Sequence, residues 1–288
     1  MSSRTAPGGF AGTSSAASRA TALSPARRRL RRIWYASRDV VLPAAVLILL
    51  VVVWEAAVRA FAIPVYLLPA PSVIWQDTTA IADAVAGHTL ATLQTVTIGF
   101  VLSIAISLPL AVLITSSPLV SNAVYPLIVL TQSIPKVALA PILVVALGAN
   151  ELPRVVVTFL VAFFPLVVSV AAGLLAVPED LIELGRSYRA SKLQQLYRIR
   201  LPYAVPFIFS GLKVAITLSV VGAVVGEFVA ADQGLGYLIT SSTAFFKTPV
   251  AFGAMILLSL MGIVLFQLVA IIERVFFPWS TSEQTVIV

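Results

Sequence analysis

The chain changes from apolar to polar at residue 178: residues 155–177 read VVVTFLVAFFPLVVSVAAGLLAV, and residues 178–202 read PEDLIELGRSYRASKLQQLYRIRLP. The apolar part is long enough to cross a bilayer, because a spanning helix needs about 20 mostly apolar residues. The polar part is the one long charged segment between apolar runs, and the next run begins at residue 207. A charged loop between two spans lies at the membrane surface, so this stretch predicts an integral membrane protein.

Composition extends this prediction to the whole chain. Its 288 residues are 59% hydrophobic and 11% charged, with a mean hydropathy of +1.02, whereas soluble domains carry about 25% charged residues. We therefore expect an all-α polytopic membrane protein with about six transmembrane helices in one domain, residues 39–276. The six apolar runs of spanning length are 41–62, 90–115, 124–147, 155–177, 207–230 and 250–272.

The distribution of Lys and Arg predicts the topology. Of 19 such residues, 14 lie before the first span, within the loop 178–206 or after the last span, and the connection 63–89 has none. Because cytoplasmic loops carry the excess of basic residues, we expect both termini and the loop 178–206 in the cytoplasm. Residues 1–38 are expected to form a disordered basic tail, and residues 277–288 a C-terminal tail.

Two other interpretations of the basic N-terminus are less favoured. A nucleic-acid-binding arm would not need to adjoin a span, where anionic lipid headgroups attract arginines. A cleaved signal peptide would need a shorter apolar run than 41–62 and a clear cleavage site. We expect an uncleaved first helix and no nucleic-acid partner.

Motifs for catalysis are missing from the sequence. There is no cysteine and a single histidine, His88, which we expect to be a surface or capping residue rather than a metal ligand. There is no Gly-x-x-x-x-Gly-Lys-Ser/Thr phosphate loop, and residues 234–237 (GLGY) lack the third glycine of a dinucleotide site. We therefore expect no catalytic residues, no metal and no cofactor bound by this chain.

Three prolines interrupt the apolar run 124–147, and Lys136 directly follows the middle one. Because proline removes a backbone donor and kinks a helix, we expect a break at 132–137. Broken spans with an ionisable residue are frequent near transport pathways, so Gln132 and Lys136 are candidate pathway residues. The alternative is that Lys136 extends its ammonium group to the membrane surface.

The run 207–230 carries two further signals. An acid at membrane depth usually faces protein or water, so Glu227 is a candidate pathway or gate residue, with an interfacial salt bridge as the alternative. Small residues recur every three or four positions, which places them on one helix face and allows close helix packing. This stripe could join two helices of one subunit or two copies at the centre of a dimer. Its members are Gly211, Ala215, Ser219, Gly222, Gly226 and Ala230.

Residues 178–202 have the pattern of two short helices. Pro178 suits a first helical turn, and acidic residues follow it where the helix dipole is positive. Ser191 is a candidate N-cap for a second helix with apolar residues at helical spacing, and Pro202 is expected to stop that helix. Composition alone allows two roles: an amphipathic pair in the lipid interface, or a surface that a partner protein binds.

The same segment resembles the cytoplasmic coupling loop of ATP-binding-cassette (ABC) importer permeases, whose pattern is Glu-Ala-Ala, three residues, Gly, nine residues, Ile, one residue, Leu-Pro. Leu184 and Gly185 replace the two alanines, and Arg189 replaces the glycine. The matching residues are Glu183, Ile199, Leu201 and Pro202. Further segments are similar to the nitrate, sulfonate and taurine branch of these permeases: 133–141 (SIPKVALAP), 162–165 (AFFP), 201–208 (LPYAVPFI), 222–228 (GAVVGEF) and 234–237 (GLGY).

The resemblance implies a type I ABC importer permease with a MetI-like fold, in which the loop 178–206 docks on an ATPase subunit. It implies a homodimer in a bacterial inner membrane, an extracytoplasmic solute-binding protein, and ATP and Mg bound by the separate ATPase. The solute would be small and anionic, similar to nitrate, sulfonates or taurine. The residues that would couple to the ATPase are Glu183, Gly185, Arg186, Arg189, Ala190, Ser191, Ile199, Leu201 and Pro202.

Two other functions are compatible with a polytopic membrane protein. An ion-coupled secondary transporter would show inverted repeats and paired intramembrane acids, and neither is visible in the sequence. A non-transporting scaffold could use the basic tail and the polar loop for protein interactions. The resemblance favours the importer over both.

We predict that cysteines introduced at Ser187 or Gln194 react only with thiol reagents that reach the cytoplasm. The chain has no cysteine of its own, so labelling reports the introduced site alone. Labelling of intact cells by a membrane-impermeant reagent would reverse the predicted topology.

Overall fold

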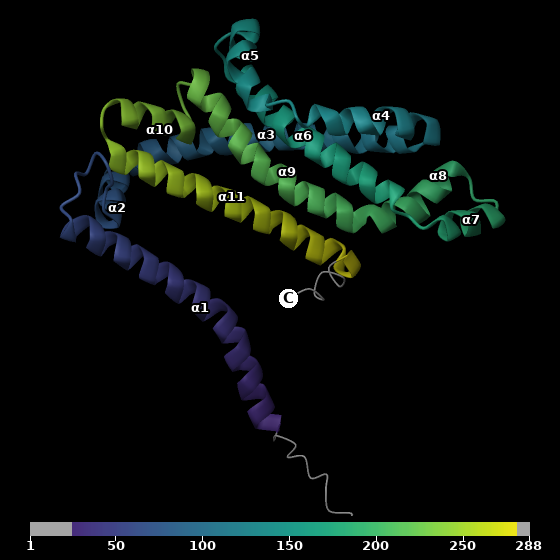
Figure 1. The fold of residues 1–288 in the computed structure, drawn as a ribbon, viewed down its shortest axis with the longest axis horizontal. Helices are drawn as coiled ribbons and strands as arrows, with labels where there is room; N and C mark the ends of the chain where they lie inside the picture. Colours follow the sequence, from purple (N-terminus) through teal and green to yellow (C-terminus); the bar gives the residue numbers. More distant parts are fainter. Residues whose placement is uncertain (1–24, 281–288) are drawn as a thin grey trace, which may run out of the picture. The chain divides into compact units, whose positions relative to one another are not determined.

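The computed structural model describes residues 25–280, with side chains from Val41 onward except Pro118. All regular secondary structure in this range is helical, as the composition predicts (Figure 1). Its short irregular elements are η1 (Lys136–Leu139, 3-10), η2 (Leu196–Arg200, π) and η3 (Pro278–Ser280, 3-10). The α-helices are α1 Pro25–Ala60, α2 Pro71–Ala80, α3 Ala82–Thr115, α4 Pro118–Thr131, α5 Ala140–Leu147, α6 Glu151–Leu175, α7 Glu179–Ser187, α8 Lys192–Gln195, α9 Leu201–Ala230, α10 Leu235–Ala244 and α11 Thr248–Phe276.

Helix length and hydropathy support five or six spans in the described residues. α4 and the segment Lys136–Leu147 are each too short to cross a membrane alone. They make a sixth span only if they count as one, and the pair is bent by 73° at a short break. The break lies between Thr131 and Lys136, where the prolines predict it. The five other segments are Val41–Ala60, Ala82–Thr115, Glu151–Leu175, Lys192–Ala230 and Thr248–Phe276.

The chain divides into two structural units, one up to Ala57 and one from Val58. The described part of the first unit belongs to helix α1, which covers residues 25–38 of the predicted tail. Arg, Leu and Ala dominate this stretch and are good helix formers. The rest of the predicted tail, residues 1–24, and residues 281–288 of the C-terminal tail lie outside the described residues.

The second unit is built around the close packing of α9 on α6. A Cβ added at Gly222 would lie 2.8 Å from the Thr158 Cα atom, so the two backbones are nearly in contact. The small-residue stripe of α9 therefore packs on α6 of the same subunit, which is the first of the two alternatives. We call this contact the seam. The other buried members are Gly211, Ala215, Ser219 and Gly226, and Ala230 is partly buried.

Helix α3 packs against α6 through hydroxyl groups. The Ser103 and Ser107 hydroxyls donate hydrogen bonds to the backbone carbonyls of Phe159 and Phe163, at 3.2 Å each. Both serines are fully buried. Because the two bonds are spaced one helical turn apart, they hold α3 and α6 in one register.

A buried ion pair joins α9 to α11. Lys213 Nζ lies 2.5 Å from Glu273 Oε2, and Glu273 is 1% exposed. The Ser280 hydroxyl, in η3, donates to the other carboxylate oxygen at 3.1 Å. A buried charge pair is stable only when its remaining polar atoms are also bonded, and here the carboxylate has a partner on each oxygen.

We predict that Gly222→Leu destabilises the folded subunit, because a leucine must push α9 away from the α6 backbone. Overpacking of this kind lowers the free energy of unfolding by about 1–3 kcal/mol. The matched control is Val221→Leu, one residue earlier on an exposed helix face. Thermal unfolding of the purified protein in detergent measures both, and equal stability of the two variants would contradict the seam.

Candidate functional site

The polar segment 178–202 forms two short helices, as predicted. α7 ends in a left-handed turn, in which Ala190 N–H donates to the Gly185 carbonyl (2.9 Å) and Arg189 N–H to the Arg186 carbonyl (2.8 Å). Arg189 has φ +56°, a conformation in which glycine is the usual residue after a helix. The family pattern has glycine at this very position, and arginine adopts the same conformation at a cost of about 1–2 kcal/mol.

The second short helix is capped by Ser191, which confirms the predicted N-cap. The Ser191 hydroxyl accepts a hydrogen bond from Gln194 N–H at 3.2 Å, and Gln194 Oε1 accepts one from Ser191 N–H at 2.8 Å. This reciprocal arrangement is a capping box. The side-chain amide of Gln195 donates a hydrogen bond of 2.9 Å to the Ala190 carbonyl, in the turn between α7 and α8.

Gly185 allows α7 to lie close to η2. A Cβ added at Gly185 would be 2.8 Å from Ile199 Cδ1. The glycine thus replaces a motif alanine where the isoleucine side chain covers the helix. Together with the Gln195 bond, this contact makes α7, α8 and η2 one compact body, which we call the coupling body (residues 179–200).

The prediction that Pro202 stops the second helix is wrong. The chain stays helical from Lys192 to Ala230. Inside a regular α-helix, proline lacks an N–H and its ring clashes with the carbonyl four residues earlier. Here the π-turn η2 precedes Pro202, and the Leu201 N–H bonds to the Leu196 carbonyl. Such π-turns are rare and often occur at functional sites. The coupling body therefore leads into α9 without an intervening loop.

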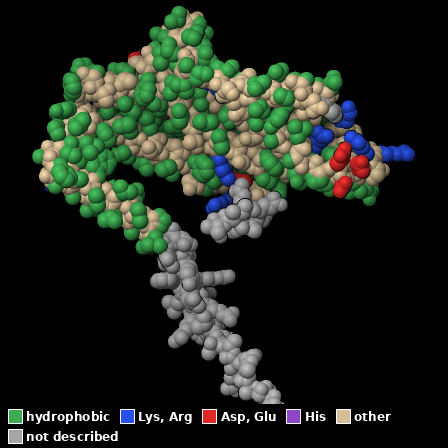
Figure 2. All heavy atoms as spheres, in the orientation of Figure 1, with side chains coloured by type: hydrophobic (Ala, Val, Ile, Leu, Met, Phe, Trp, Pro, Cys, Tyr) green, Lys and Arg blue, Asp and Glu red, His purple; other side chains and the backbone are tan. Residues whose placement is uncertain are grey.

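A hollow of about 390 Å³ lies on the coupling body. Its lining includes exposed apolar side chains, among them Leu184 (54% exposed) and Tyr188 (81%). Charged side chains gather over α7 and α8, while they are sparse over most of the rest of the visible surface (Figure 2). An apolar hollow with charged surroundings suits a protein partner.

The predicted coupling residues lie in three places. Those that line the hollow are Gly185, Ala190 and Ile199. Those exposed on the coupling body are Glu183, Arg186, Arg189 and Ser191, and α9 begins with Leu201 and Pro202.

Lys136 closes the break after α4. Its ammonium group donates to the backbone carbonyls of Thr131 (3.0 Å), Gln132 (3.2 Å) and Ile134 (3.5 Å). It also lies 4.8 Å from the centroid of the Phe164 ring. The last carbonyls of a helix have no backbone N–H partner, and here the Lys136 ammonium group bonds to them instead. Neither prediction for Lys136, a pathway residue or an ammonium group at the membrane surface, included this role. The Gln132 side chain is exposed in the same break.

Glu227 is buried where α9 meets α10, at 1% exposure. Its Oε2 atom accepts a hydrogen bond from Gly236 N–H at 2.7 Å. A Cβ added at Gly236 would lie 2.8 Å from the Glu227 Cβ atom, and Gly234 has φ +119°. The Gly-Leu-Gly sequence therefore lets the carboxylate reach the start of α10. Within one subunit, Glu227 caps this helix and does not reach the surface.

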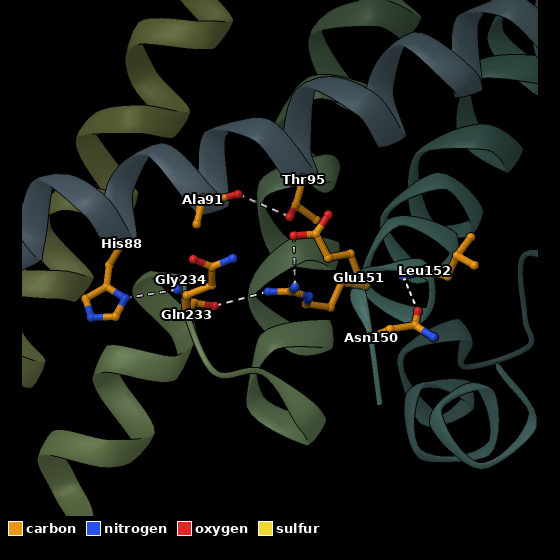
Figure 3. A network of polar contacts seen from close by, with 9 residues as sticks. His88, Ala91, Thr95, Asn150, Glu151, Leu152, Gln233 and Gly234 are labelled. Carbon is orange, nitrogen blue, oxygen red and sulfur yellow. Dashed lines mark hydrogen bonds and ion pairs between the residues drawn. The ribbon is translucent and has the colours of Figure 1, made fainter. Parts of the chain in front are cut away.

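The start of α10 is also tied to α3 and α6. Gly234 N–H donates to His88 Nδ1 at 3.1 Å, which confirms His88 as a capping residue (Figure 3). The N–H of the next residue donates to Thr92 Oγ1 at 2.7 Å. Arg154 of α6 donates to the Gln233 carbonyl at 3.2 Å. Helices α3 and α9 thus supply the acceptors that the first N–H groups of α10 lack, and α6 holds the backbone carbonyl just before this helix.

Arg154, Thr92 and Arg200 were not among the predicted site residues. Only Arg154 could have been found from the sequence, because an arginine beside an apolar run is costly unless it is paired. In the structure it is 4% exposed. Nothing in the local sequence distinguishes Thr92 from other hydroxyl residues. Arg200 is one of several arginines in its segment.

Comparison with known proteins shows the family. The family model described as the binding-protein-dependent transport system inner membrane component matches residues 103–281. This range is more than half of the chain and includes the coupling body. The chain therefore belongs to this family, the permeases of ABC importers.

Individual relatives agree with this assignment. The formylaminopyrimidine transport permease protein ThiX of Halalkalibacterium halodurans is 37% identical over 242 residues, covering 84% of this chain and 96% of the relative. The taurine transport system permease protein TauC of Escherichia coli is 27% identical over 264 residues, covering 89% and 96%. The resemblance to ABC importer permeases, with a taurine permease among the relatives, is thereby confirmed.

The fold is also found in a solved structure. An inward-facing structure of the MetNI methionine ABC transporter contains a chain with a TM-score of 0.57 and 22% sequence identity. The match covers 65% of this chain and 93% of that chain. At this identity the likeness shows the fold alone, and it confirms the predicted all-α permease architecture.

We predict that Arg189→Gly leaves solute uptake intact, because glycine adopts φ +56° without strain. Arg189→Val should lower the yield of folded protein, because a β-branched residue is strongly disfavoured in this conformation. Both changes remove the same charge, so the pair separates the backbone effect from the charge effect. An equal loss of uptake in both variants would instead show that the guanidinium group is needed.

Proposed function

We propose that this chain is the permease subunit of an importer that moves a small solute inward by alternating access, driven by a separate ATPase. The observation that carries the proposal is the hollow on the coupling body, which leads into α9 without a loop. A protein seated in the hollow would move α9 directly. The family match over residues 103–281, which include this segment, favours a protein partner over an amphipathic pair lying in lipid.

The proposed assembly contains two copies of this chain and two ATPase subunits, with a solute-binding protein on the opposite side of the membrane. ATP and Mg would bind to the ATPase subunits, and this chain would contribute no catalytic residue. The excess of Lys and Arg supports a cytoplasmic position for the coupling body and both termini. The spans would lie in a bacterial inner membrane.

For the solute, an aminopyrimidine-like compound has more support than a small anion such as nitrate or a sulfonate. The relative of 37% identity is named for formylaminopyrimidine transport, and the one named for taurine is 27% identical. Lys136 adds no support for an anion, because its ammonium group is already bonded to three carbonyls. Uptake of an aminopyrimidine and of taurine would be compared directly.

The test is reconstitution in lipid vesicles with an ATPase subunit and a solute-binding protein of an ABC importer from the same organism. We expect uptake that requires both ATP and the binding protein, together with ATP hydrolysis stimulated by the loaded binding protein. Uptake driven by an ion gradient without ATP would support a secondary transporter. Absence of uptake, with no effect of the chain on ATP hydrolysis, would support a scaffold.

We predict that Gly185→Trp and Glu183→Ala reduce uptake while membrane insertion is unchanged, because both alter the coupling body and neither alters a span. Loss of one central interface contact lowers binding by about tenfold or more. The matched controls are Gly87→Trp, where an added side chain meets open space, and Asp83→Ala, an exposed acid of α3. Normal uptake in both test variants would remove the docking role from the hollow.

A further inference from the structure

The coupling body is tied to a second helix at its base. Arg200, the last residue of η2, donates a hydrogen bond from Nη1 to the backbone carbonyl of Thr115 at 3.1 Å, across 85 residues of sequence. Thr115 is the last residue of α3, and its own hydroxyl bonds back to the Ala111 carbonyl at 2.8 Å. A cation at the C-terminal end of a helix is also favoured by the helix dipole. The guanidinium group therefore closes the end of α3.

The end of α3 is a junction. Only Ser116 and Ser117 separate Thr115 from α4, and α4 leads to the break that Lys136 caps. Earlier in α3, two serine hydroxyls hold the helix in register with α6. A displacement of the last turn of α3 would therefore act on both α6 and the broken span.

We propose that Arg200 is a positioning residue for energy coupling: it transmits movement of the coupling body to the junction of α3 and α4. The broken span then follows the coupling body, in addition to α9. This inference rests on the proposed function, because it requires that an ATPase moves the coupling body. The role needs a positively charged donor at the end of α3, and lysine keeps both the charge and a donor there.

The first experiment separates transmission from simple capping. Arg200→Ala and Arg200→Lys are compared in vesicles with the ATPase and binding protein present, with Arg274→Ala as the control, an exposed arginine in the last turn of α11. We expect Arg200→Ala to lower the solute moved per ATP hydrolysed by about five- to tenfold, a usual size for coupling between sites. Arg200→Lys should retain most of the ratio, and the control all of it. If Arg200→Ala leaves the solute moved per ATP hydrolysed unchanged, the proposal is overturned. This includes the case in which uptake and hydrolysis fall by the same factor.

The second experiment keeps Arg200 and does not depend on the folding of its variants. Spin labels are attached to Ser116→Cys and Tyr197→Cys, both exposed positions in a chain without cysteine, in dimers diluted with unlabelled chain. The distance between the two labels should be equal in the ATP-bound and ATP-free states. A change in this distance would overturn the role of Arg200.

A third label pair tests the proposed function separately. In dimers that carry Tyr197→Cys alone, the distance between the two copies should change when ATP binds. If it changes while the Ser116–Tyr197 distance also changes, the importer stands and the inference about Arg200 fails. If the distance between copies does not change, the proposed function fails, and the inference fails with it.

Discussion

Backbone groups without a hydrogen-bond partner are the constraint on which this structure depends. The hydrocarbon layer of a membrane contains no water to bond them, so each interruption of an apolar helix needs a side chain to close it. Lys136 closes the end of α4, Glu227 and His88 close the start of α10, and Arg200 closes the end of α3. In a chain with 11% charged residues, these polar side chains are placed where a helix begins or ends.

The close contact of α6 with α9 follows from the same surroundings. Apolar helices gain little from burying more apolar surface when the solvent is lipid, so packing and hydrogen bonds between helices hold them together. Gly222 brings the two backbones into contact, and two serines tie α3 to α6. A force on α9 would therefore pass to α6, which favours rocking of packed helices over bending of a single helix.

Two of the three departures of the coupling segment from the family pattern, at Gly185 and Arg189, have different physical reasons. At Gly185, a side chain would meet Ile199, so glycine allows the two parts of the coupling body to pack closely. At Arg189, the backbone has the left-handed conformation that glycine favours, and arginine is tolerated there because its side chain is exposed. The conformation of the segment is thus compatible with the pattern even where the residues differ.

The sequence by itself determined the features that depend on local periodicity and composition. These are the all-α membrane class, the apolar runs of spanning length, the break near Lys136 and the capping of α8 by Ser191, because each depends on residues within a few helical turns. The same local rules failed at Pro202. A π-turn there accommodates the proline within a longer helix.

Only the tertiary structure decided which side chains serve which helix ends. The bond from Arg200 to Thr115 and the bond from Gly234 to His88 join residues that lie far apart in the chain. The small-residue stripe was equally compatible with a neighbouring helix or a second copy until its contact with Thr158 was known. Periodicity shows which face of a helix is small or apolar, but it does not contain the identity of the helix that packs on that face.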